Sequence, residues 1–348
     1  MRKSAFPVLF SLLVSAIALI GCANKQPQRV EIDPASLQSF GSLPSVMESP
    51  DNPLTPEKVA LGRKLYFEKH LSKSQDISCN TCHPLEDYGA EDSAVSEGFK
   101  GQKGSRNAPT VFNAAGHIAQ FWDGRAPDVE AQAKGPMMNP IEMAMPSDKI
   151  VVATLKSMEK YREGFKKAFP EDKDPITLDN AAKAIGAFER TLTTPSRWDK
   201  FLNGDHAALS DEEKAGFNKF AEVGCPACHS GVYVGGSMFQ KLGMVKPWPS
   251  TSDEGRYAVT KQEADRMVFK VPSLRNIDRT APYFHDGSVE KLDDAVKAMA
   301  EYQLGRKLND QETQEIVTWL KSLRGTLYTV SVRQASQSSA VKEKPDRS

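Results

Sequence analysis

The pentapeptide Cys79-Asn80-Thr81-Cys82-His83 recurs in kind as Cys225-Pro226-Ala227-Cys228-His229 in the second half of this 348-residue chain. Each stretch is a Cys-x-x-Cys pair followed directly by histidine, which is the attachment pattern of a c-type haem. The two thiols bind the haem covalently, and the imidazole reaches the iron as its proximal ligand. We therefore expect two covalently bound haem c groups, with the fold built around them.

Two other uses of such cysteine pairs fit less well. A thioredoxin-like dithiol needs no following histidine and lies where a strand leads into a helix, a context that surrounds neither pair. A zinc site can use two pairs, but these lie much further apart than the pairs of a zinc ribbon. Of the five cysteines, only Cys22 lies outside the two motifs.

The first 22 residues have the character of an export signal. A basic start precedes an apolar run, Phe6 to Ile20, that is too short to span a membrane comfortably. The run ends in Leu19-Ile20-Gly21-Cys22, which resembles the cleavage box of bacterial lipoproteins. We expect Cys22 to become the lipidated first residue of the mature protein, followed by a polar tether over 23–42. The alternative is an ordinary signal peptide cut near Ala23, with Cys22 discarded.

Length and composition indicate two domains of ordinary size. The 45 basic and 45 acidic side chains cancel, so net charge gives no indication of a nucleic-acid partner. The hydrophobic fraction of 39% is low and the 22 prolines are many, as in a fold whose long loops surround a cofactor.

Helical periodicity dominates, so we predict a mostly α fold with long loops between helices. Thr55-Pro56 starts a helix that leads to the first motif, and a capping box from Ser210 starts a helix that ends before the second. Further helices are expected over residues 147–168, 178–192, 291–302 and 310–323. The expected boundary at Thr194-Pro195-Ser196 gives domains at 43–195 and 196–327, followed by a flexible tail over 328–348.

Further stretches resemble the bacterial dihaem cytochrome c peroxidase family, in the family's own order. They are Gly101-Gln102-Lys103-Gly104-Ser105-Arg106-Asn107-Ala108-Pro109-Thr110-Val111-Phe112-Asn113, Gln120-Phe121-Trp122-Asp123-Gly124-Arg125-Ala126, Gln132-Ala133-Lys134-Gly135-Pro136, Leu274-Arg275-Asn276 and Ala281-Pro282-Tyr283-Phe284-His285. The resemblance covers about residues 55–323. It implies two class I cytochrome c-like domains with one covalent haem each: an N-terminal peroxidatic domain that binds hydrogen peroxide, and a C-terminal electron-accepting domain.

The resemblance also implies the ligands of the two irons. His83 would bind the first iron, while His229 and Met299 would bind the second, because a thioether ligand raises the reduction potential. Without the family pattern around it, Met299 reads as an ordinary core residue on a helix face. Tyr302 lies nearby, and a tyrosine binds the second iron in the related methylamine-dehydrogenase maturation enzymes.

By the same resemblance, Glu142 would move the peroxide proton, Gln132 would be its polar partner, and Trp122 would assist electron transfer between the haems. The family also holds a calcium ion between its domains, and oxygen ligands suit that ion. The matching positions are the Asn107 side chain and the carbonyl groups of Thr280 and Pro282. His285 would support a haem propionate.

The chain departs from the family in one loop. Many members carry a histidine there that caps the peroxidatic iron until the other haem is reduced, but Phe99 stands nearest that position and no histidine lies between His83 and His117. Either the first site is open in the oxidised protein, or another group such as His117 or Glu97 occupies it.

Three functions follow as hypotheses. The first is a peroxidase that reduces hydrogen peroxide to water with electrons from a small cytochrome c or copper protein. The second is a dihaem electron carrier without a substrate, and the third is a peroxide-using oxidase of a partner protein. We expect a periplasmic protein of a Gram-negative bacterium, lipid-anchored to the membrane, a possible homodimer, and no nucleic-acid partner.

Overall fold

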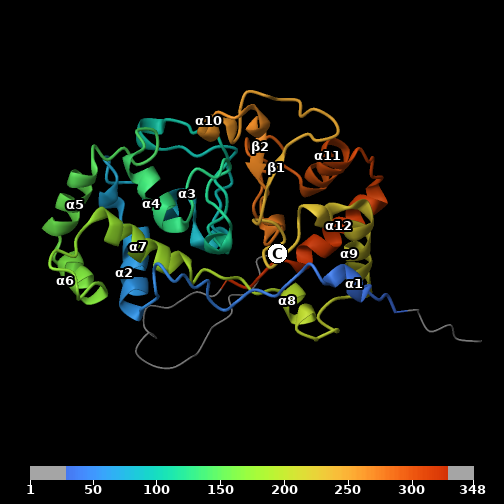
Figure 1. The fold of residues 1–348 in the computed structure, drawn as a ribbon, viewed down its shortest axis with the longest axis horizontal. Helices are drawn as coiled ribbons and strands as arrows, with labels where there is room; N and C mark the ends of the chain where they lie inside the picture. The colour runs from blue at the N-terminus through green and yellow to red at the C-terminus, as the bar shows by residue number, and fades with distance from the viewer. Residues whose placement is uncertain (1–28, 328–348) are drawn as a thin grey trace, which may run out of the picture.

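The computed structural model describes residues 29–327. In chain order the elements are α1 (Pro34–Leu37), α2 (Pro56–Tyr66), α3 (Cys79–Cys82), α4 (Val129–Met138), α5 (Asp148–Ser157), α6 (Glu159–Ala168), α7 (Leu178–Glu189), α8 (Arg197–Leu202), α9 (Asp211–Val223), β1 (Phe239–Lys241), α10 (Tyr257–Thr260), β2 (Val268–Lys270), α11 (Leu292–Leu304) and α12 (Asp310–Ser322). Figure 1 shows two halves, one around α2 and α7 and the other around α9 and α12. The mostly helical fold is confirmed, and the strands β1 and β2 pair antiparallel.

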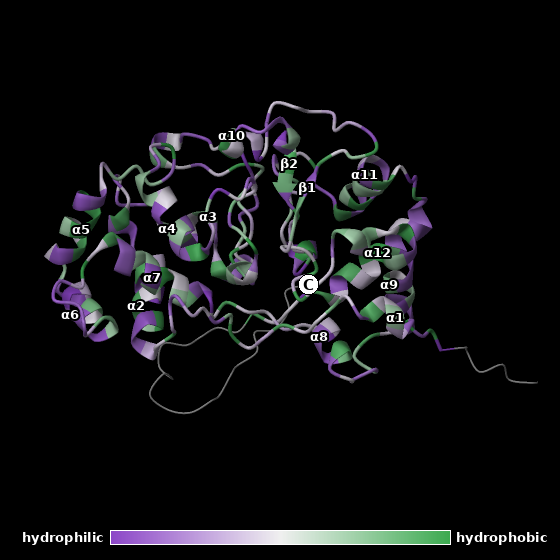
Figure 2. Ribbon diagram, in the orientation of Figure 1, coloured by the Kyte–Doolittle hydropathy of each residue, from purple (hydrophilic) through white to green (hydrophobic). Residues whose placement is uncertain are grey.

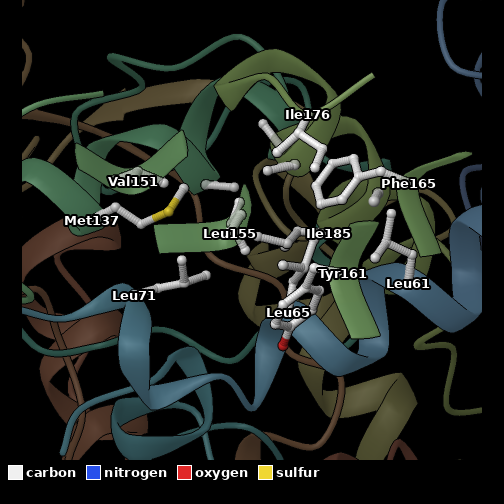
Figure 3. Packing of buried hydrophobic residues seen from close by; sticks show 14 of the residues in the cluster. Leu61, Leu65, Leu71, Met137, Val151, Leu155, Tyr161, Phe165, Ile176 and Ile185 are labelled. Atoms are coloured by element: carbon white, nitrogen blue, oxygen red, sulfur yellow. The ribbon is translucent and has the colours of Figure 1, made fainter. Parts of the chain in front are cut away.

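In the first half, α2 packs against α7 at Gly62. A Cβ atom there would lie 1.7 Å from the carbonyl oxygen of Ala184, so only glycine lets the two backbones approach this closely. Figure 3 shows the apolar core beside this crossing, where Leu65 of α2 meets Tyr161 of α6 and Ile185 of α7. The crossing and this core together hold the helix that precedes the first motif.

The second half repeats the crossing with α9 and α12. A Cβ atom on Gly216 of α9 would lie 2.1 Å from the carbonyl oxygen of Glu315. The core beside it is aromatic: the ring centroid of Trp198 lies 5.0 Å from that of Phe217 and 5.4 Å from that of Trp319. In each half, the helix before the Cys-x-x-Cys-His motif therefore packs on the last helix of that half.

Two asparagines mark the border between the halves. Asn113 and Asn276 follow the related stretches Ala-Pro-Thr-Val-Phe and Val-Pro-Ser-Leu-Arg, and both have positive φ, 62° and 60°. Each donates a hydrogen bond from Nδ2 to Oγ1 of the buried Thr194, at 2.8 and 2.9 Å. The buried residues from Leu61 to Ile185 and from Trp198 to Leu323 form separate clusters on either side of this point.

The predicted helix starts are confirmed. Oγ1 of Thr55 accepts from the amide of Lys58 at 3.2 Å and caps α2, whereas Ser210 and Glu213 form the capping box of α9. Gly224 ends α9 in the left-handed conformation, with φ of 102°.

The single helix predicted over 147–168 is wrong, because the chain is extended at Met158 and separates α5 from α6. Leu155 of α5 and Tyr161 of α6 are both fully buried. They are six positions apart, a spacing that puts them on different faces of one continuous helix. The break turns both side chains into the same core.

The expected tether over 23–42 is also corrected, for its described part from residue 29 on. Ile32 is buried in the core of the second half, and Phe40 packs edge-on against Phe217 at 5.4 Å. The amide of Leu43 then donates to Asp199 at 2.7 Å. The segment is polar overall, but its apolar residues Ile32 and Phe40 pack on the second half and fix the segment there.

The expected signal peptide with Cys22 and the expected tail over 328–348 lie outside the described residues. Within residues 29–327, none of the helices has both the length and the apolar character that a membrane crossing requires.

The strand β2 lies between the halves (Figure 1), and its residues Phe269 and Lys270 line a cavity there. Its three residues are buried, and Figure 2 shows it as hydrophobic, in contrast to the mainly hydrophilic α6 at the outer edge. Beside it, Arg106 of the first half makes two hydrogen bonds to Asp253 of the second, at 2.6 and 2.8 Å. Arg106 also binds Asp123 at 2.6 Å, so a half-buried ion network joins the halves.

Candidate functional site

The first motif occupies α3 and the residue after it. Cys79 and Cys82 lie at the ends of α3, and His83 follows. Nδ1 of His83 lies 3.2 Å from the carbonyl oxygen of Gly89, so Nδ1 carries the proton and the Nε2 lone pair is left for a metal. Tyr66 of α2 donates to the carbonyl oxygen of His83 at 2.7 Å. Burial lowers the pKa of His83, which keeps the ring neutral, as a ligand must be.

Glu142 lies beside this motif, in the wall of a small cavity. Its Oε1 accepts a hydrogen bond from Nδ2 of Asn139 at 2.8 Å. Burial raises the pKa of Glu142, although the nearby charge of Arg125 opposes the shift. Burial and the carboxylates of Glu91 and Glu142 together raise the pKa of Cys82 to about 11, which places both carboxylates near the first motif. The cavity is lined by Phe121, Arg125, Ala126, Ala131, Gly135, Pro136, Asn139 and Glu142.

Gln132 comes from α4, which supplies much of this cavity wall. The helix begins at Asp128, whose side chain accepts from the amide of Ala131. Gln132 is half-buried and lies three and four residues before Gly135 and Pro136, hence on the same helix face. Gln132 itself is not among the described residues that line the cavity.

The loop that lacks a histidine lies directly on the Glu142 segment. The amide of Phe99 donates to the carbonyl oxygen of Glu142 at 2.8 Å. A Cβ atom on Gly98 would lie 2.2 Å from the carbonyl oxygen of Ile141, so the two segments touch through their backbones. The Glu97 side chain is exposed to solvent.

The second motif opens onto a second, mainly apolar cavity, which is lined by residues of both halves. Cys225 and Cys228 follow α9, and His229 lies in the cavity wall. Burial lowers the pKa of His229 to about 4, so this ring is neutral too. The carbonyl groups of Val234 and Pro272 lie near its Nδ1, which makes no hydrogen bond of ordinary geometry.

The donor sets of both motifs fit a haem c. Each offers two thiols and one neutral imidazole, and the four described cysteines form no disulfide. Met299 of α11 lines the same cavity as His229, which brings the two expected ligands of the second iron together. Tyr302 packs instead against Trp248, with ring centroids 5.0 Å apart, and is absent from the described lining of this cavity.

Trp122 belongs to the partition between the two cavities. Phe121, just before it, lines both cavities, and Trp122 lines the second. The indole Nε1 donates to the carbonyl oxygen of Asn107 at 2.9 Å, and the carbonyl oxygen of Trp122 accepts from the amide of Lys270 at 2.8 Å. The indole is therefore held by the first half, and the backbone of Trp122 is held by β2 of the second half.

The residues assigned to calcium, Asn107, Thr280 and Pro282, all lie in the wall of the second cavity. Nδ2 of Asn107 donates to the carbonyl oxygen of Ser93 at 3.0 Å, so its Oδ1 is the atom of this amide that could bind a cation. The described residues contain no group of three or more His, Cys, Asp or Glu suited to a metal, so a cation here depends on amide and carbonyl oxygens. His285, also in this wall, stacks on Phe269 at 4.4 Å.

Two residues of the second cavity were not foreseen there. His117 lies in its wall, so the hypothesis that His117 caps the first iron is wrong. Lys270 is buried in the same wall, although sequence reasoning did not single it out. The signal was its position within Val268-Phe269-Lys270-Val271, a lysine in an apolar strand.

Comparisons with known proteins agree with this arrangement. The family model of the di-haem cytochrome c peroxidases matches residues 56–207. The cytochrome c551 peroxidase of Nitrosomonas europaea is 48% identical over 281 residues, 79% of this chain and 83% of that protein. The cytochrome c551 peroxidase of Pseudomonas aeruginosa is 46% identical over 286 residues, 80% of this chain and 82% of that protein.

One solved structure is similar in fold and, to a lesser degree, in sequence. It is the crystal structure of a MauG-like protein associated with microbial copper homeostasis. The TM-score is 0.73 at 28% identity, and the match covers 82% of this chain and 94% of that one.

Proposed function

The chain belongs to the di-haem cytochrome c peroxidase family, and from this membership we propose that it reduces hydrogen peroxide to water with electrons from a small periplasmic cytochrome c or copper protein. The observation that carries the proposal is the cavity beside Glu142. Its described lining contains neither histidine nor methionine, the side chains that would fill a sixth position on the first iron. A peroxide has room there, whereas a pure electron carrier would have both irons fully ligated.

The haem attached at Cys79 and Cys82 would supply the redox chemistry that cleaves the O–O bond, with His83 as its ligand. Overall, one peroxide, two electrons and two protons give two waters. Glu142 takes the proton from one peroxide oxygen and returns it to the other. The pKa of Glu142, raised by burial, suits this role, because it makes the carboxylate a better proton acceptor than an ordinary glutamate. The hydrogen bond from Asn139 holds the carboxylate in place.

Electrons would enter at the second haem, held by Cys225 and Cys228 with His229 and Met299 as axial ligands. The thioether of Met299 favours a high potential there. Trp122 lies on the path to the first haem, and its hydrogen bond to Asn107 fixes the plane of the indole. The likeness to a MauG-like protein keeps a peroxide-using oxidase of a partner protein as the second candidate. The packing of Tyr302 away from the second cavity favours the peroxidase.

The proposed activity is tested by the steady-state oxidation of a reduced small cytochrome c by hydrogen peroxide, with no pre-reduction of the enzyme. We expect turnover from the oxidised protein and a high-spin first haem, because Phe99 stands where many relatives carry the capping histidine. Glu142→Gln should lower kcat/KM by about 10²- to 10⁴-fold, the usual contribution of a general acid–base. Glu171→Gln is the matched control, because Glu171 is an exposed carboxylate of the first half in the loop between α6 and α7, and this variant should keep full activity.

A Glu142→Gln enzyme within a few-fold of wild type would remove Glu142 from the mechanism. A wild-type protein without peroxide turnover, before and after half-reduction, would favour the carrier or the partner-protein oxidase instead.

Three further parts of the proposal have their own tests. A calcium ion on Asn107, Thr280 and Pro282 predicts that chelation lowers activity and that added calcium restores it. Lipid attachment at Cys22 predicts a membrane-bound protein in the periplasm that Cys22→Ser releases in soluble form. A homodimer predicts twice the chain mass in light scattering.

A further inference from the structure

A buried cation lies in the wall of the second cavity and has no acidic partner within residues 29–327. Lys270 is 7% exposed, and its Nζ has one side-chain partner among the described residues, Nδ1 of His117 at 3.4 Å. Burial lowers the pKa of Lys270 to about 8, so the ammonium form still predominates at neutral pH. An ammonium group held away from water without a counter-charge is costly, which indicates that an anion belongs here.

His117 presents a second donor to the same cavity. Lys270 Nζ has no acceptor lone pair, so His117 Nδ1 must accept and the ring proton must lie on Nε2. Nε2 is buried and has no hydrogen-bond partner. Tyr233 holds the ring edge-on, with centroids 5.4 Å apart. Burial, with the charge of Lys270, holds the pKa of His117 well below its ordinary range, so the ring is a neutral donor.

The position of these two donors fits the edge of a haem c that carries its two propionate groups. The thioether bonds form at the vinyl groups, and the two propionates project from the opposite edge of the porphyrin. Cys225 packs into the core formed by α9 and α12, on the outer side of the second half (Figure 1). Lys270 comes from β2, which lies between the halves in Figure 1, and His117 comes from a segment of the first half, so both donors reach the cavity from where the first half borders it.

We propose that Lys270 and His117 bind the propionates of the second haem, Lys270 through a charge-assisted hydrogen bond and His117 through Nε2–H. This rests on the proposed second haem but not on peroxide reduction. The cation offsets the propionate charge and so favours the reduced iron. His117 makes the first half a direct binding partner of the second haem.

The test is a potentiometric titration of the purified holoprotein, which reads the second haem without peroxide or donor. Lys270→Met should shift its oxidation equilibrium about tenfold toward the oxidised form, equivalent to about 59 mV for one electron. Lys241→Met is the matched control. Lys241 lines the same cavity from β1 but is exposed, so water already screens its charge, and less than a twofold shift is expected.

A Lys270→Met protein with full haem content and a shift no larger than that of Lys241→Met would overturn the proposal. Should Lys270→Met fail to mature, His117→Phe keeps the ring volume and removes the Nε2 donor. Its potential should fall in the same direction, and an unchanged value would overturn the proposal as well. If the wild-type protein shows no peroxidase activity, the same shifts in the potential of the second haem are still expected. The two proposals are therefore tested independently.

Discussion

The buried ion pair between Asp199 and Arg275 offers the sharpest test of how the second half is held together. Arg275 Nη1 and Nη2 lie 2.8 and 2.9 Å from the two carboxylate oxygens, and the side chains are 0% and 6% exposed for Arg275 and Asp199. Asp199 also accepts from the amides of Ser196 and Leu43, each at 2.7 Å. One carboxylate therefore joins α8, the N-terminal segment and the stretch Leu274-Arg275-Asn276.

Asp199→Asn should lower the free energy of unfolding by about 3–5 kcal/mol, because it leaves the guanidinium of Arg275 buried without a counter-charge. With a urea slope of about 2 kcal/mol/M, the midpoint of the second half should fall by about 1.5–2.5 M. Unfolding is followed by tryptophan fluorescence at pH 7. Asp174→Asn is the control, because its ion pair with Lys156 is exposed and should contribute less than about 1 kcal/mol.

The pH dependence gives an independent check. Although burial works against it, the guanidinium of Arg275 holds the pKa of Asp199 below its ordinary value of 3.8. A depressed carboxyl pKa gives stability that is present above 3.8 and is lost as the pH falls through the folded-state pKa. The difference in unfolding free energy between the wild type and Asp199→Asn should therefore become smaller in strong acid. A loss below about 1 kcal/mol at pH 7, or a difference in unfolding free energy that persists at low pH, would show that this ion pair does not stabilise the second half.

Two other carboxyl groups should make the free energy of unfolding depend on pH, Glu189 from 4.5 to about 8 and Glu68 from 4.5 down to about 2. Burial raises the pKa of Glu189 from 4.5 to about 8, so the folded protein binds a proton that the unfolded chain releases, and stability falls as the pH rises through this range. Glu189→Gln should flatten that fall in urea midpoints, and a wild-type midpoint constant from pH 5 to 8 would contradict it. Against the effect of burial, the hydrogen bond from Lys160 lowers the pKa of Glu68 to about 2, so its contribution is present above 4.5 and lost toward pH 2. Glu68→Gln should lower the midpoint at pH 7 but not at pH 2, and equal losses at both would count against the ion pair.

The sequence predicted those features whose causes are local. The two pentapeptides specify their own chemistry, and the helix starts at Thr55 and Ser210 are set by side chains that bond amides two or three residues away. The expected boundary at Thr194-Pro195-Ser196 rests on a local signal of the same kind, because proline and hydroxyl residues interrupt the helical pattern there. These signals act within one turn of chain and need no tertiary contact.

The features that could not be predicted depend on distant partners. The chain breaks at Met158 because Leu155 of α5 and Tyr161 of α6 are both buried in the same core, which one continuous helix would not allow. Ile32 and Phe40 fix the N-terminal segment only because the second half offers a surface for them. His117 was one alternative for the cap of the first iron, but its loop leaves the first half and lies in the wall of the second cavity. Periodicity carries no information about such crossings.

The loop over residues 107–122 has a consequence for recombination between relatives. Asn107, His117, Phe121 and Trp122 line the second cavity although they precede the border at Thr194 by more than seventy positions. In a chimera joined at that border, the residues of the 107–122 loop that line the second cavity would come from one parent. The lining residues after Thr194 would come from the other parent. Exchange of a complete second cavity therefore requires this loop to be exchanged together with the C-terminal half, as two separate inserts rather than one.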